Sequence, residues 1–289
     1  MNVKEAIRIH SENVDEFTRR RALADAQRRN SLSELIRLFV NSSDRGEASE
    51  VYESYRQTMP SSSYEDRAEL CMALAVSKVY GAEMWSRCFA GDDIAAGSHG
   101  KISLVRNKYN EIAFSRFSRI LKRPKEIFVS SFTAACEDVY DSESEFCILP
   151  IENGQNGRLF GFYSMLDRYE LKICAVCELD GEDEVGAKYA LVGRSAPDRI
   201  PKNANWGYEF SVISGSGRAL SEISGVSRIF GAELLKIDSL PVEYDSGLQK
   251  YYFTFDIPEA NISAFDLFLS EEYSGYTSVG VYPTVDQDK

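Results

Sequence analysis

The segment CILPIENGQNG, residues 147–157, carries the clearest structural signal in this chain of 289 residues. A short apolar strand pattern passes directly into a proline, a carboxylate, an amide and two glycines, and a helical pattern follows from residue 159. A buried strand that ends in a polar, glycine-rich turn before a helix is a common way in which α/β proteins present a ligand-binding loop. The segment therefore predicts an α/β fold with a ligand loop at one sheet edge.

Around this segment, from residue 101 to residue 195, strand and helix patterns alternate. Apolar strand patterns occur at 102–105, 127–129, 146–151, 171–179 and 189–192, and helical patterns at 110–121, 132–140 and 159–169. Continuous apolar strands between helices are typical of a parallel sheet covered on both faces. We predict a parallel-sheet α/β lobe over 101–195, comparable to one half of a periplasmic binding protein.

Residues 205–285 have a different order of elements. Strand patterns lie at 208–213, 232–238, 249–255 and 277–282, and helical patterns at 218–230 and 260–269. The order strand, helix, strand, strand, helix, strand predicts a ferredoxin-like βαββαβ unit. Units of this kind commonly pair sheet to sheet, so we expect a homodimer formed through this region.

Residues 1–98 have helical patterns throughout. The sequence SLSE at 31–34 has the form of a capping box and predicts a helix start, and Ser63 with Asp66 predicts the start of an amphipathic stretch that reaches Trp85. Glycine, serine and aspartate residues between 91 and 100 indicate a linker. We predict a helical bundle over 1–98, so that the chain is a multidomain protein of mixed α/β and α+β class.

Composition and charge exclude several classes of partner. The net charge is −12, whereas binding to nucleic acid or to an anionic membrane surface needs basic patches. No apolar run approaches the ~20 residues of a membrane span, and the N-terminus lacks the apolar core of a signal peptide. We expect a cytoplasmic protein that binds neither nucleic acid nor membrane.

The cysteines give no sign of metal or redox chemistry. The six cysteines lie mostly within apolar or helical patterns, which suits buried, reduced thiols. Cys174 and Cys177 match C-x-x-C, but in a strand pattern residues three apart point to opposite faces. There is no second cysteine pair and there are only two histidines, so we expect no metal and no cofactor.

The middle and C-terminal regions together resemble prephenate dehydratase, in which an ACT regulatory domain follows the catalytic region. The family pattern is found in SF at 131–132, an acidic helix, LPIEN at 149–153, Gly157 and the helix that leads to LKI at 171–173. IDSLP at 237–241 is similar to the I-E-S-R-P of the family, and Ala219-Leu220 falls where its G-A-L motif lies. The resemblance implies a role linked to aromatic amino acid, chorismate or prephenate metabolism.

Three departures from the family pattern bear on catalysis. The glycine-rich loop after the first strand is replaced by RNKYN at 106–110, which is shorter and has no glycine. The second lobe, normally inserted after the 171–179 strand, is absent. The T-R-F motif that supplies the catalytic threonine aligns with Ala187-Lys188-Tyr189, and alanine has no hydroxyl to donate. We expect dehydratase activity to be lost, and we assign no catalytic residue.

Six residues are candidates for binding a small anionic or aromatic ligand: Arg106, Lys108, Glu152, Asn153, Gly154 and Gly157. In the family the loop that contains Glu152 and Asn153 lines the substrate cleft. The alternative is a turn in which Asn153 caps the following helix and Glu152 lies near its positive end. Arg106 and Lys108 either meet an anionic ligand beside this loop or form a solvated pair.

Five further residues are candidates for a ligand site in the ACT-like region: Arg218, Ala219, Leu220, Asp238 and Ser239. Arg218 stands where the family has the glycine of G-A-L, Asp238 replaces a glutamate, and Leu240 replaces an arginine. Arg218 either pairs with a ligand carboxylate or is a surface arginine on a domain retained for dimerisation.

Two function hypotheses follow. The first is a binding or regulatory protein, a dehydratase relative that lost catalysis and kept one lobe and a dimerising ACT-like domain. The second is an enzyme with altered chemistry, a decarboxylase, lyase or isomerase acting on prephenate or a related cyclohexadiene acid. In the second case the helical region or a dimer partner would replace the missing cleft wall. A third possibility, that the N-terminal helices carry the main activity, stays open.

Overall fold

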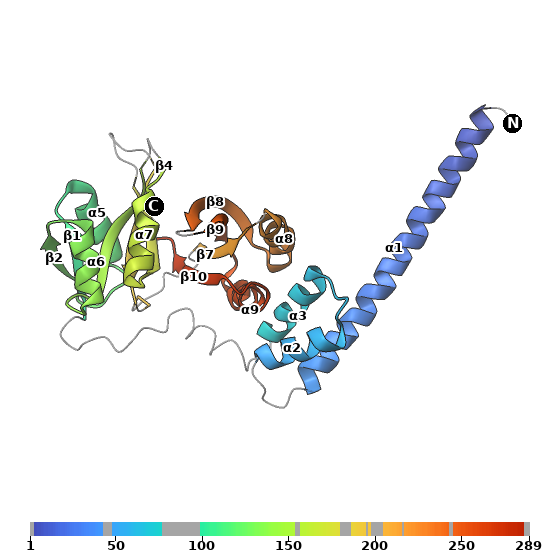
Figure 1. The fold of residues 1–289 in the computed structure, drawn as a ribbon, viewed down its shortest axis with the longest axis horizontal. Helices are drawn as coiled ribbons and strands as arrows, with labels where there is room; N and C mark the ends of the chain where they lie inside the picture. Colours follow the sequence, from blue (N-terminus) through green and yellow to red (C-terminus); the bar gives the residue numbers. More distant parts are fainter. Residues whose placement is uncertain are drawn as a thin grey trace.

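The computed structural model describes residues 3–42, 48–76, 99–153, 157–179, 186–194, 196–197, 205–215, 217–242 and 245–285. Its helices are α1 (Val3–Ser42), α2 (Ala48–Thr58), α3 (Tyr64–Val76), α5 (Lys108–Phe117), α6 (Phe132–Tyr140), α7 (Phe160–Tyr169), α8 (Arg218–Val226) and α9 (Ile262–Glu272), with short 3₁₀ turns η1 (Ser227–Phe230) and η2 (Glu259–Asn261). Its strands are β1 (Lys101–Val105), β2 (Lys125–Val129), β3 (Phe146–Asn153), β4 (Gly157–Arg158), β5 (Lys172–Leu179), β6 (Ala187–Gly193), β7 (Trp206–Ser214), β8 (Glu233–Val242), β9 (Asp245–Asp256) and β10 (Tyr276–Pro283). Figure 1 shows how they are arranged.

The strands of the described ranges form one ten-stranded mixed sheet. Its order is β2-β1-β3-β6-β5-β10-β7-β9-β8, and β4 pairs with β3 at the side. The first five strands in this order belong to the α/β lobe and the last four to the ferredoxin-like unit. The mixed α/β architecture predicted from the sequence is confirmed.

Within the lobe, only part of the sheet is parallel. β1 pairs in parallel with β2 and with β3, as expected. β6 lies antiparallel between β3 and β5. The expectation of a parallel sheet fails here because residues 180–186 alone connect β5 to β6, and a parallel crossover needs a dozen or more residues. Helix α5 packs into the core on one face of the lobe, and α6 and α7 into the core on the other.

Cys174 and Cys177 of the C-x-x-C motif lie on the same face of β5, not on opposite faces as predicted. The register between β5 and β6 shifts between Ile173 and Ala175, so the simple alternation of faces is interrupted. Cys174 and Cys177 consequently lie in the same buried cluster, on the face covered by α5. Burial raises the pKa of each thiol to about 12, so both stay protonated at neutral pH.

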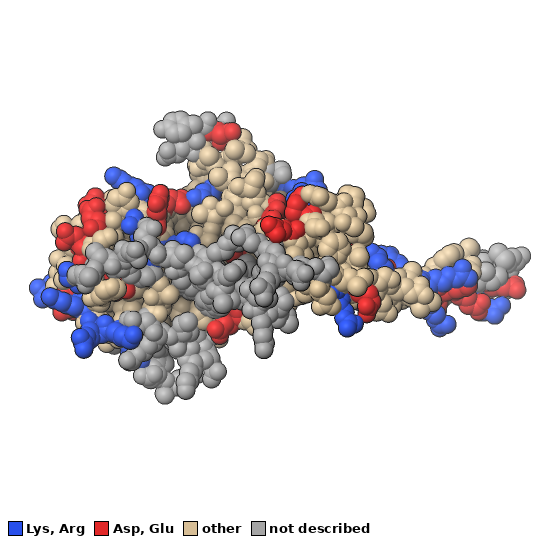
Figure 2. Space-filling view, turned by 90° about the horizontal axis from the view of Figure 1, so that it is seen from below, with Lys and Arg blue, Asp and Glu red and all other residues tan. Residues whose placement is uncertain are grey.

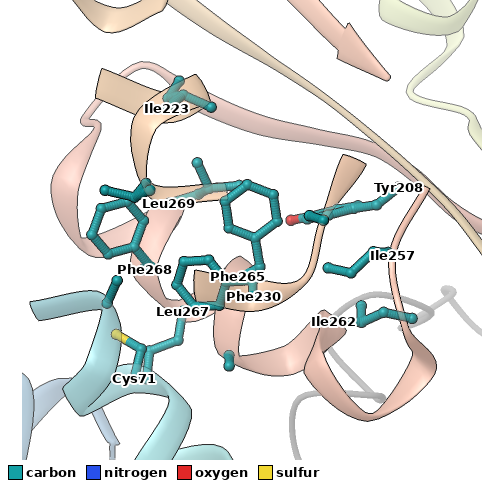
Figure 3. Close-up of a cluster of buried hydrophobic side chains, with 14 of the residues drawn as sticks. Cys71, Tyr208, Ile223, Phe230, Ile257, Ile262, Phe265, Leu267, Phe268 and Leu269 are labelled. Atoms are coloured by element: carbon teal, nitrogen blue, oxygen red, sulfur yellow. The ribbon is translucent and has the colours of Figure 1, made fainter. Parts of the chain in front are cut away.

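The C-terminal unit has the predicted ferredoxin-like topology. Its strands follow the spatial order β10-β7-β9-β8, and every neighbouring pair is antiparallel. Helices α8 and α9 cover one face of this sheet, and an aromatic core of Phe210, Phe230, Phe253, Phe255 and Phe265 fills the space between. Figure 3 shows Phe230 and Phe265 among the side chains of this core.

The other face of the ferredoxin-like sheet packs against α7 of the lobe. The ring of Tyr163 on α7 stacks on Tyr252 of β9, with centroids 3.7 Å apart. The hydroxyls of Tyr163 and Tyr282 both donate to the carboxylate of Glu209, which is fully buried on β7. Tyr252 donates to Asp167 on α7 at 2.9 Å. Because a buried carboxylate needs such donors, these tyrosines hold the lobe and the C-terminal unit together.

The sheets of the two units join edge to edge between β5 and β10. Ile173 and Gly280 pair in parallel, and the amide of Val285 donates to the carbonyl of Val176 at 2.7 Å. A Cβ on Gly280 would lie 2.5 Å from the carbonyl oxygen of Ile173, closer than real side chains approach. Only glycine therefore permits the join at this position.

The described N-terminal residues form helices that pack together, as predicted, but the first helix starts earlier than expected. The SLSE sequence at 31–34 lies inside α1, which runs without a break for 40 residues, so it does not start a helix. The Ser63–Asp66 capping box is confirmed: the Ser63 amide donates to Asp66 Oδ2 at 2.9 Å, and the Asp66 amide donates to Ser63 Oγ at 3.2 Å. The predicted continuation beyond Val76 to Trp85, and the predicted linker up to residue 98, lie outside the described residues.

α2 and α3 share a hydrophobic core with the ferredoxin-like unit. Leu70, Cys71 and Leu74 of α3 are fully buried in the cluster that contains Phe265 and Phe268. Figure 3 shows Cys71 at the edge of this cluster, beside α9. None of the described helices combines the length and the apolarity that a membrane crossing requires.

A buried ion pair fixes this contact. Arg67 of α3 donates to both carboxylate oxygens of Glu272 on α9, at 2.7 and 2.9 Å, and the two side chains are 12% and 4% exposed. Tyr52 of α2 donates its hydroxyl hydrogen to the same carboxylate. Burial raises the pKa of Tyr52, so the hydroxyl stays protonated and the donor is retained.

We predict that Arg67→Met destabilises the protein by roughly 3 kcal/mol, because it leaves the Glu272 carboxylate buried without its cation. Urea unfolding followed by circular dichroism measures the change. The control is Arg37→Met, since Arg37 forms only an exposed pair with Glu34 at 3.9 Å and should leave the midpoint unchanged. Equal midpoints for both variants would show that the pair does not anchor the helices.

We also predict that Gly280→Ala costs about 2 kcal/mol, since the new methyl group would overlap Ile173. The matched control is Gly225→Ala, within α8, where an added Cβ meets nothing within 4 Å. That change should stabilise the protein by about 0.5–1 kcal/mol through helix propensity. Opposite signs in urea melts of the two variants are expected, and a neutral Gly280→Ala would contradict the close strand contact.

Candidate ligand-binding site

A cavity of about 290 Å³ lies where the lobe meets the ferredoxin-like unit. Its walls come from strands of both units. The lining residues are Ile151, Val176, Glu178, Lys188, Asn205, Trp206, Gly207, Leu235, Thr254, Asp256, Tyr282 and Thr284. The volume is at the small end of the range for ligand pockets, which suits a metabolite rather than a polymer.

Local irregularities in the strands place these side chains. The pairing of β3 with β6 shifts register between Pro150 and Glu152, so Ile151 forms a bulge and turns its apolar side chain into the cavity wall. A second shift lies between Leu234 and Lys236 on β8, which leaves Leu235 58% exposed on the opposite wall. Bulges commonly redirect side chains next to functional sites.

Glu152 connects the two units beside the cavity. Its carboxylate accepts a hydrogen bond from Lys236 Nζ of β8 at 2.8 Å, and Lys188 Nζ of β6 lies 3.9 Å from the other oxygen. Lys236 also lies 3.9 Å from Asp238. Glu152 and Asp238 are only 16% and 17% exposed, whereas Lys188 and Lys236 are 39% and 33% exposed, so the carboxylates are more withdrawn from solvent than the lysines.

The cavity itself has charges of both signs. Lys188 belongs to the Glu152 group and also lines the cavity, so it joins the two. Glu178 and Asp256 are exposed carboxylates on the wall, and within the described ranges neither forms an ion pair. With Val176, Leu235 and Tyr282 as apolar walls, the cavity offers a cation, carboxylates and apolar surface within one small volume.

Across the described ranges, no group of three or more histidine, cysteine, aspartate or glutamate residues is arranged to hold a metal ion.

The structure does not bring all of the predicted ligand residues together. Glu152 follows the lining residue Ile151 and lies 3.9 Å from the lining residue Lys188, but it does not itself line the cavity, and its ligand role stays a prediction. Arg106 instead contacts Glu111 at 3.9 Å and the ring of Phe128, and Lys108 lies over the ring of Tyr109. In the part of the chain that the structure describes, neither Arg106 nor Lys108 forms an ion pair with Glu152. The loop between them has a local role, because Asn107 Oδ1 accepts from the Asn110 amide at 2.8 Å and caps α5.

Strands β3 and β4 pair antiparallel on either side of residues 154–156. Asn153 pairs with Gly157 across β3 and β4, and Gly154 lies outside the described residues. The alternative role for Asn153, as the cap of the next helix, is wrong, because α7 begins at Phe160 with Leu159 as its N-cap residue. The intervening strand β4 separates the turn from the helix.

The ACT-like candidates lie on two faces of the ferredoxin-like sheet. Arg218 on α8 is 77% exposed and pairs with Glu222 at 2.5 Å, while Ala219 is buried and Leu220 packs on the core beneath α8. Asp238 pairs in register with Tyr252, whose ring faces α7, and the neighbouring Ser239 is exposed. A single-chain site that uses all five residues is therefore not formed, and their role stays a prediction.

Comparison with solved structures shows which known fold this chain resembles. The chain matches a prephenate dehydratase from Streptococcus mutans with a TM-score of 0.54 and 18% sequence identity, over 64% of this chain and 98% of that one. The fold is prephenate-dehydratase-like. A second solved structure, titled GqqA, a novel type of quorum quenching acylase, matches with a TM-score of 0.51 and 16% identity, over 63% of this chain and 94% of that one.

Sequence comparison alone finds no such match. No protein-family model matches the chain, and no curated protein matches it either. The relationship to the prephenate-dehydratase-like fold, predicted above from LPIEN and the motifs around it, is therefore confirmed by shape. The identification of the ferredoxin-like unit as an ACT domain stays a prediction.

Sequence reasoning missed Lys236, Glu178 and Asp256. Lys236 is 84 residues from Glu152 along the chain, and nothing local marks it as a partner. From the sequence, Lys188 was named only as the middle residue of Ala187-Lys188-Tyr189 and was not predicted to bind a ligand. Strand order gives no signal either, because β8 lies at one edge of the sheet and β3 is six places away; only the three-dimensional path of the sheet brings Lys236 to Glu152.

We predict that Glu152 and Lys236 are energetically coupled by about 0.5–1 kcal/mol, as expected for a partly exposed ion pair. A double-mutant cycle of Glu152→Gln and Lys236→Met, read by urea unfolding, measures the coupling. The matched cycle uses Arg106 and Glu111, which are 3.9 Å apart and more exposed, and should give a smaller value. Equal couplings in the two cycles would argue against a specific bridge between the units.

Proposed function

We propose that this protein is a prephenate-dehydratase relative that binds a small amino-acid-like ligand in the junction cavity and does not dehydrate prephenate. The proposed loss of dehydratase activity rests on Ala187. It occupies the position of the family's catalytic threonine, it is fully buried at the start of β6, and it carries no hydroxyl. Residues 180–186, which join β5 to β6, leave no room in the sequence for a second catalytic lobe.

The fold alone does not select a reaction. One structural neighbour is described as a prephenate dehydratase and another as a quorum quenching acylase, although both match this chain to a similar extent. Proteins described by different activities thus share this scaffold, and function has to be argued from the site.

The chemistry of the cavity favours a zwitterion with an apolar side chain. Lys188 supplies a cation for a carboxylate, and Glu178 or Asp256 supplies an anion for an ammonium group. Val176, Leu235 and Tyr282 supply apolar surface for the side chain. An aromatic amino acid has all three features, which agrees with the metabolic context implied by the sequence resemblance.

The location of the cavity supports a regulatory role. Lys188 and Glu178 belong to the lobe, whereas Leu235 and Asp256 belong to the ferredoxin-like unit. A ligand that contacts both sets of residues stabilises their present arrangement over any more open one. Ligand binding would therefore strengthen the contact between the lobe and the ferredoxin-like unit.

We also propose that the ferredoxin-like unit is an ACT-like domain that pairs with a second copy. Its strand β8 ends the sheet and has one unpaired edge in the single chain. Leu235 and Ile237 on this strand are 58% and 38% exposed. Unpaired, partly apolar edge strands are the usual sites of strand addition.

One observation favours the alternative, an enzyme acting on a prephenate-like acid. Glu152 lies between Lys236 and Lys188 beside the cavity, so a carboxylate that can accept a proton and ammonium groups that can donate one stand close together. Decarboxylation or isomerisation of a cyclohexadiene acid would need little more than positioning and one such group.

A thermal-shift experiment separates these proposals. We expect L-phenylalanine, L-tyrosine or L-tryptophan to raise Tm, since a ligand at 100 times its Kd adds about 2.7 kcal/mol of stability. Lys188→Met and Glu178→Gln should abolish the shift. The matched control is Lys172→Met, at the opposite end of β5, which should retain it.

Prephenate and chorismate are assayed in parallel, with chromatography of the products. We expect prephenate to be recovered unchanged. Formation of phenylpyruvate at enzymatic rates would overturn the loss of dehydratase activity, and any other product that disappears in Glu152→Gln would establish the alternative enzyme. Absence of a shift with all three amino acids would overturn the proposed ligand class.

A further inference from the structure

Among the described lysines and arginines, only Arg116 of α5 is buried, at 5% exposed. On the face of the molecule that Figure 2 shows, lysine and arginine side chains lie at the surface beside acidic ones. A buried guanidinium normally faces a carboxylate, as Arg67 faces Glu272. Within the described ranges Arg116 forms no ion pair, and its Nη1 donates instead to the backbone carbonyl of Glu178 on β5. The burial of this arginine therefore has a reason other than charge pairing.

The Glu178 carbonyl lies on the edge of β5 along which β10 runs. The amide of Val285 donates to the carbonyl of Val176 at 2.7 Å, and carbonyls two residues apart along a strand point to the same edge. In this register the Glu178 carbonyl would be reached by the amide of residue 287, and the described chain ends at Val285. Arg116 supplies a donor to the carbonyl at this position.

Arg116 approaches β5 from the face opposite the junction cavity. Cys177 belongs to the cluster beneath α5, whereas Val176 and Glu178 line the cavity. The charge of Arg116 is close enough to Cys177 to offset part of the rise in pKa that burial gives this thiol. Arg116 itself is not among the lining residues. It thus holds the backbone of a cavity residue without occupying the cavity.

Glu178 is better placed than Asp256 to bind an ammonium group. It lies directly opposite Lys188 in the pairing of β5 with β6, and residues opposite each other in such a pair have Cβ atoms about 4.5–5.5 Å apart. A cation for a carboxylate and an anion for an ammonium group are therefore neighbours, as the two groups are in an amino acid. Asp256 instead lies opposite Glu233, a second carboxylate, in the pairing of β8 with β9.

We propose that Arg116 positions Glu178, and that Glu178 rather than Asp256 binds the ammonium group of the ligand. This rests on the amino-acid-like ligand proposed above, and it names the group of that ligand on which selectivity depends. Arg116 does not touch the ligand. It holds the edge of β5 that faces away from β6, so that the Glu178 side chain leaves the strand at a fixed place beside Lys188.

Titration calorimetry compares the amino acid that raises Tm with its des-amino counterpart, for example L-phenylalanine with 3-phenylpropanoate. We expect the wild-type chain to prefer the amino acid and Glu178→Gln to lose this preference. Arg116→Met should reduce the preference by about tenfold, the size of one charge-assisted hydrogen bond, and leave the Kd of the des-amino acid unchanged. Arg116→Lys, which keeps a charged donor, should restore most of the preference.

Two variants serve as controls for this comparison. Ala113→Gly weakens the same helix through its propensity, so both Kd values should change equally and the preference should persist. Asp256→Asn should also retain the preference. Equal weakening of both ligands in Arg116→Met would reduce Arg116 to a general structural role and overturn the proposal. So would a preference that is lost in Asp256→Asn and kept in Glu178→Gln.

Hydrogen exchange tests the role of Arg116 without a ligand. In Arg116→Met the amides of residues 177–179, at the end of β5, should exchange faster than in the wild-type chain. Residues 146–148 of β3 also lie beneath α5, and their rates should stay the same unless the whole helix has loosened.

Unchanged exchange at 177–179 would show that Arg116 does not hold this strand, whether or not an amino acid binds. If exchange changes as expected and no amino acid binds the wild-type chain, the proposed ligand class is wrong and the assignment of Glu178 falls with it. The two failures are thereby told apart.

Discussion

The contact between β5 and β10 is the constraint on which the rest of the molecule depends. Two sheets meet there edge to edge, and the approach of the Gly280 backbone to Ile173 leaves no space for a side chain. Because the two units share one sheet, α7 packs on the face of the ferredoxin-like strands, Tyr163 reaches Tyr252, and Lys236 reaches Glu152. The junction cavity is lined by strands of both units, including Val176 of β5 and Tyr282 of β10.

The buried polar groups at the junction give the arrangement its specificity. Glu209 is fully buried and accepts hydrogen bonds from Tyr163 of the lobe and from Tyr282 of β10. A sliding of one unit against the other would leave this carboxylate without donors in a dry environment, which is costly. Apolar packing alone would tolerate such sliding. The relative placement of the two units, and with it the shape of the cavity, is therefore defined by a few polar atoms.

Much of the fold followed from local patterns in the sequence. Alternating apolar residues located the strands, and the order of elements over 205–285 predicted the ferredoxin-like topology. The errors arose where geometry is not local. The bulge beside Ile173 placed Cys174 and Cys177 in one cluster, the short connection made β6 antiparallel, and SLSE at 31–34 was absorbed into the longer α1. In the candidate site, Glu152 was found because a motif surrounds it. Lys236 was not, because only the folded sheet brings it there.

Asp66 connects two features that are usually independent of each other. Its carboxylate accepts the Ser63 amide at the start of α3 and also binds Arg28 of α1. The side chain that caps the N-terminus of the short helix α3 thereby also contributes to the angle between α3 and the long helix α1. The direction of α1 is set by this contact together with the packing of Leu32 and Ile36 in the core shared with α2 and α3. Loss of this one carboxylate would therefore weaken the start of α3 and the attachment of α1 at the same time.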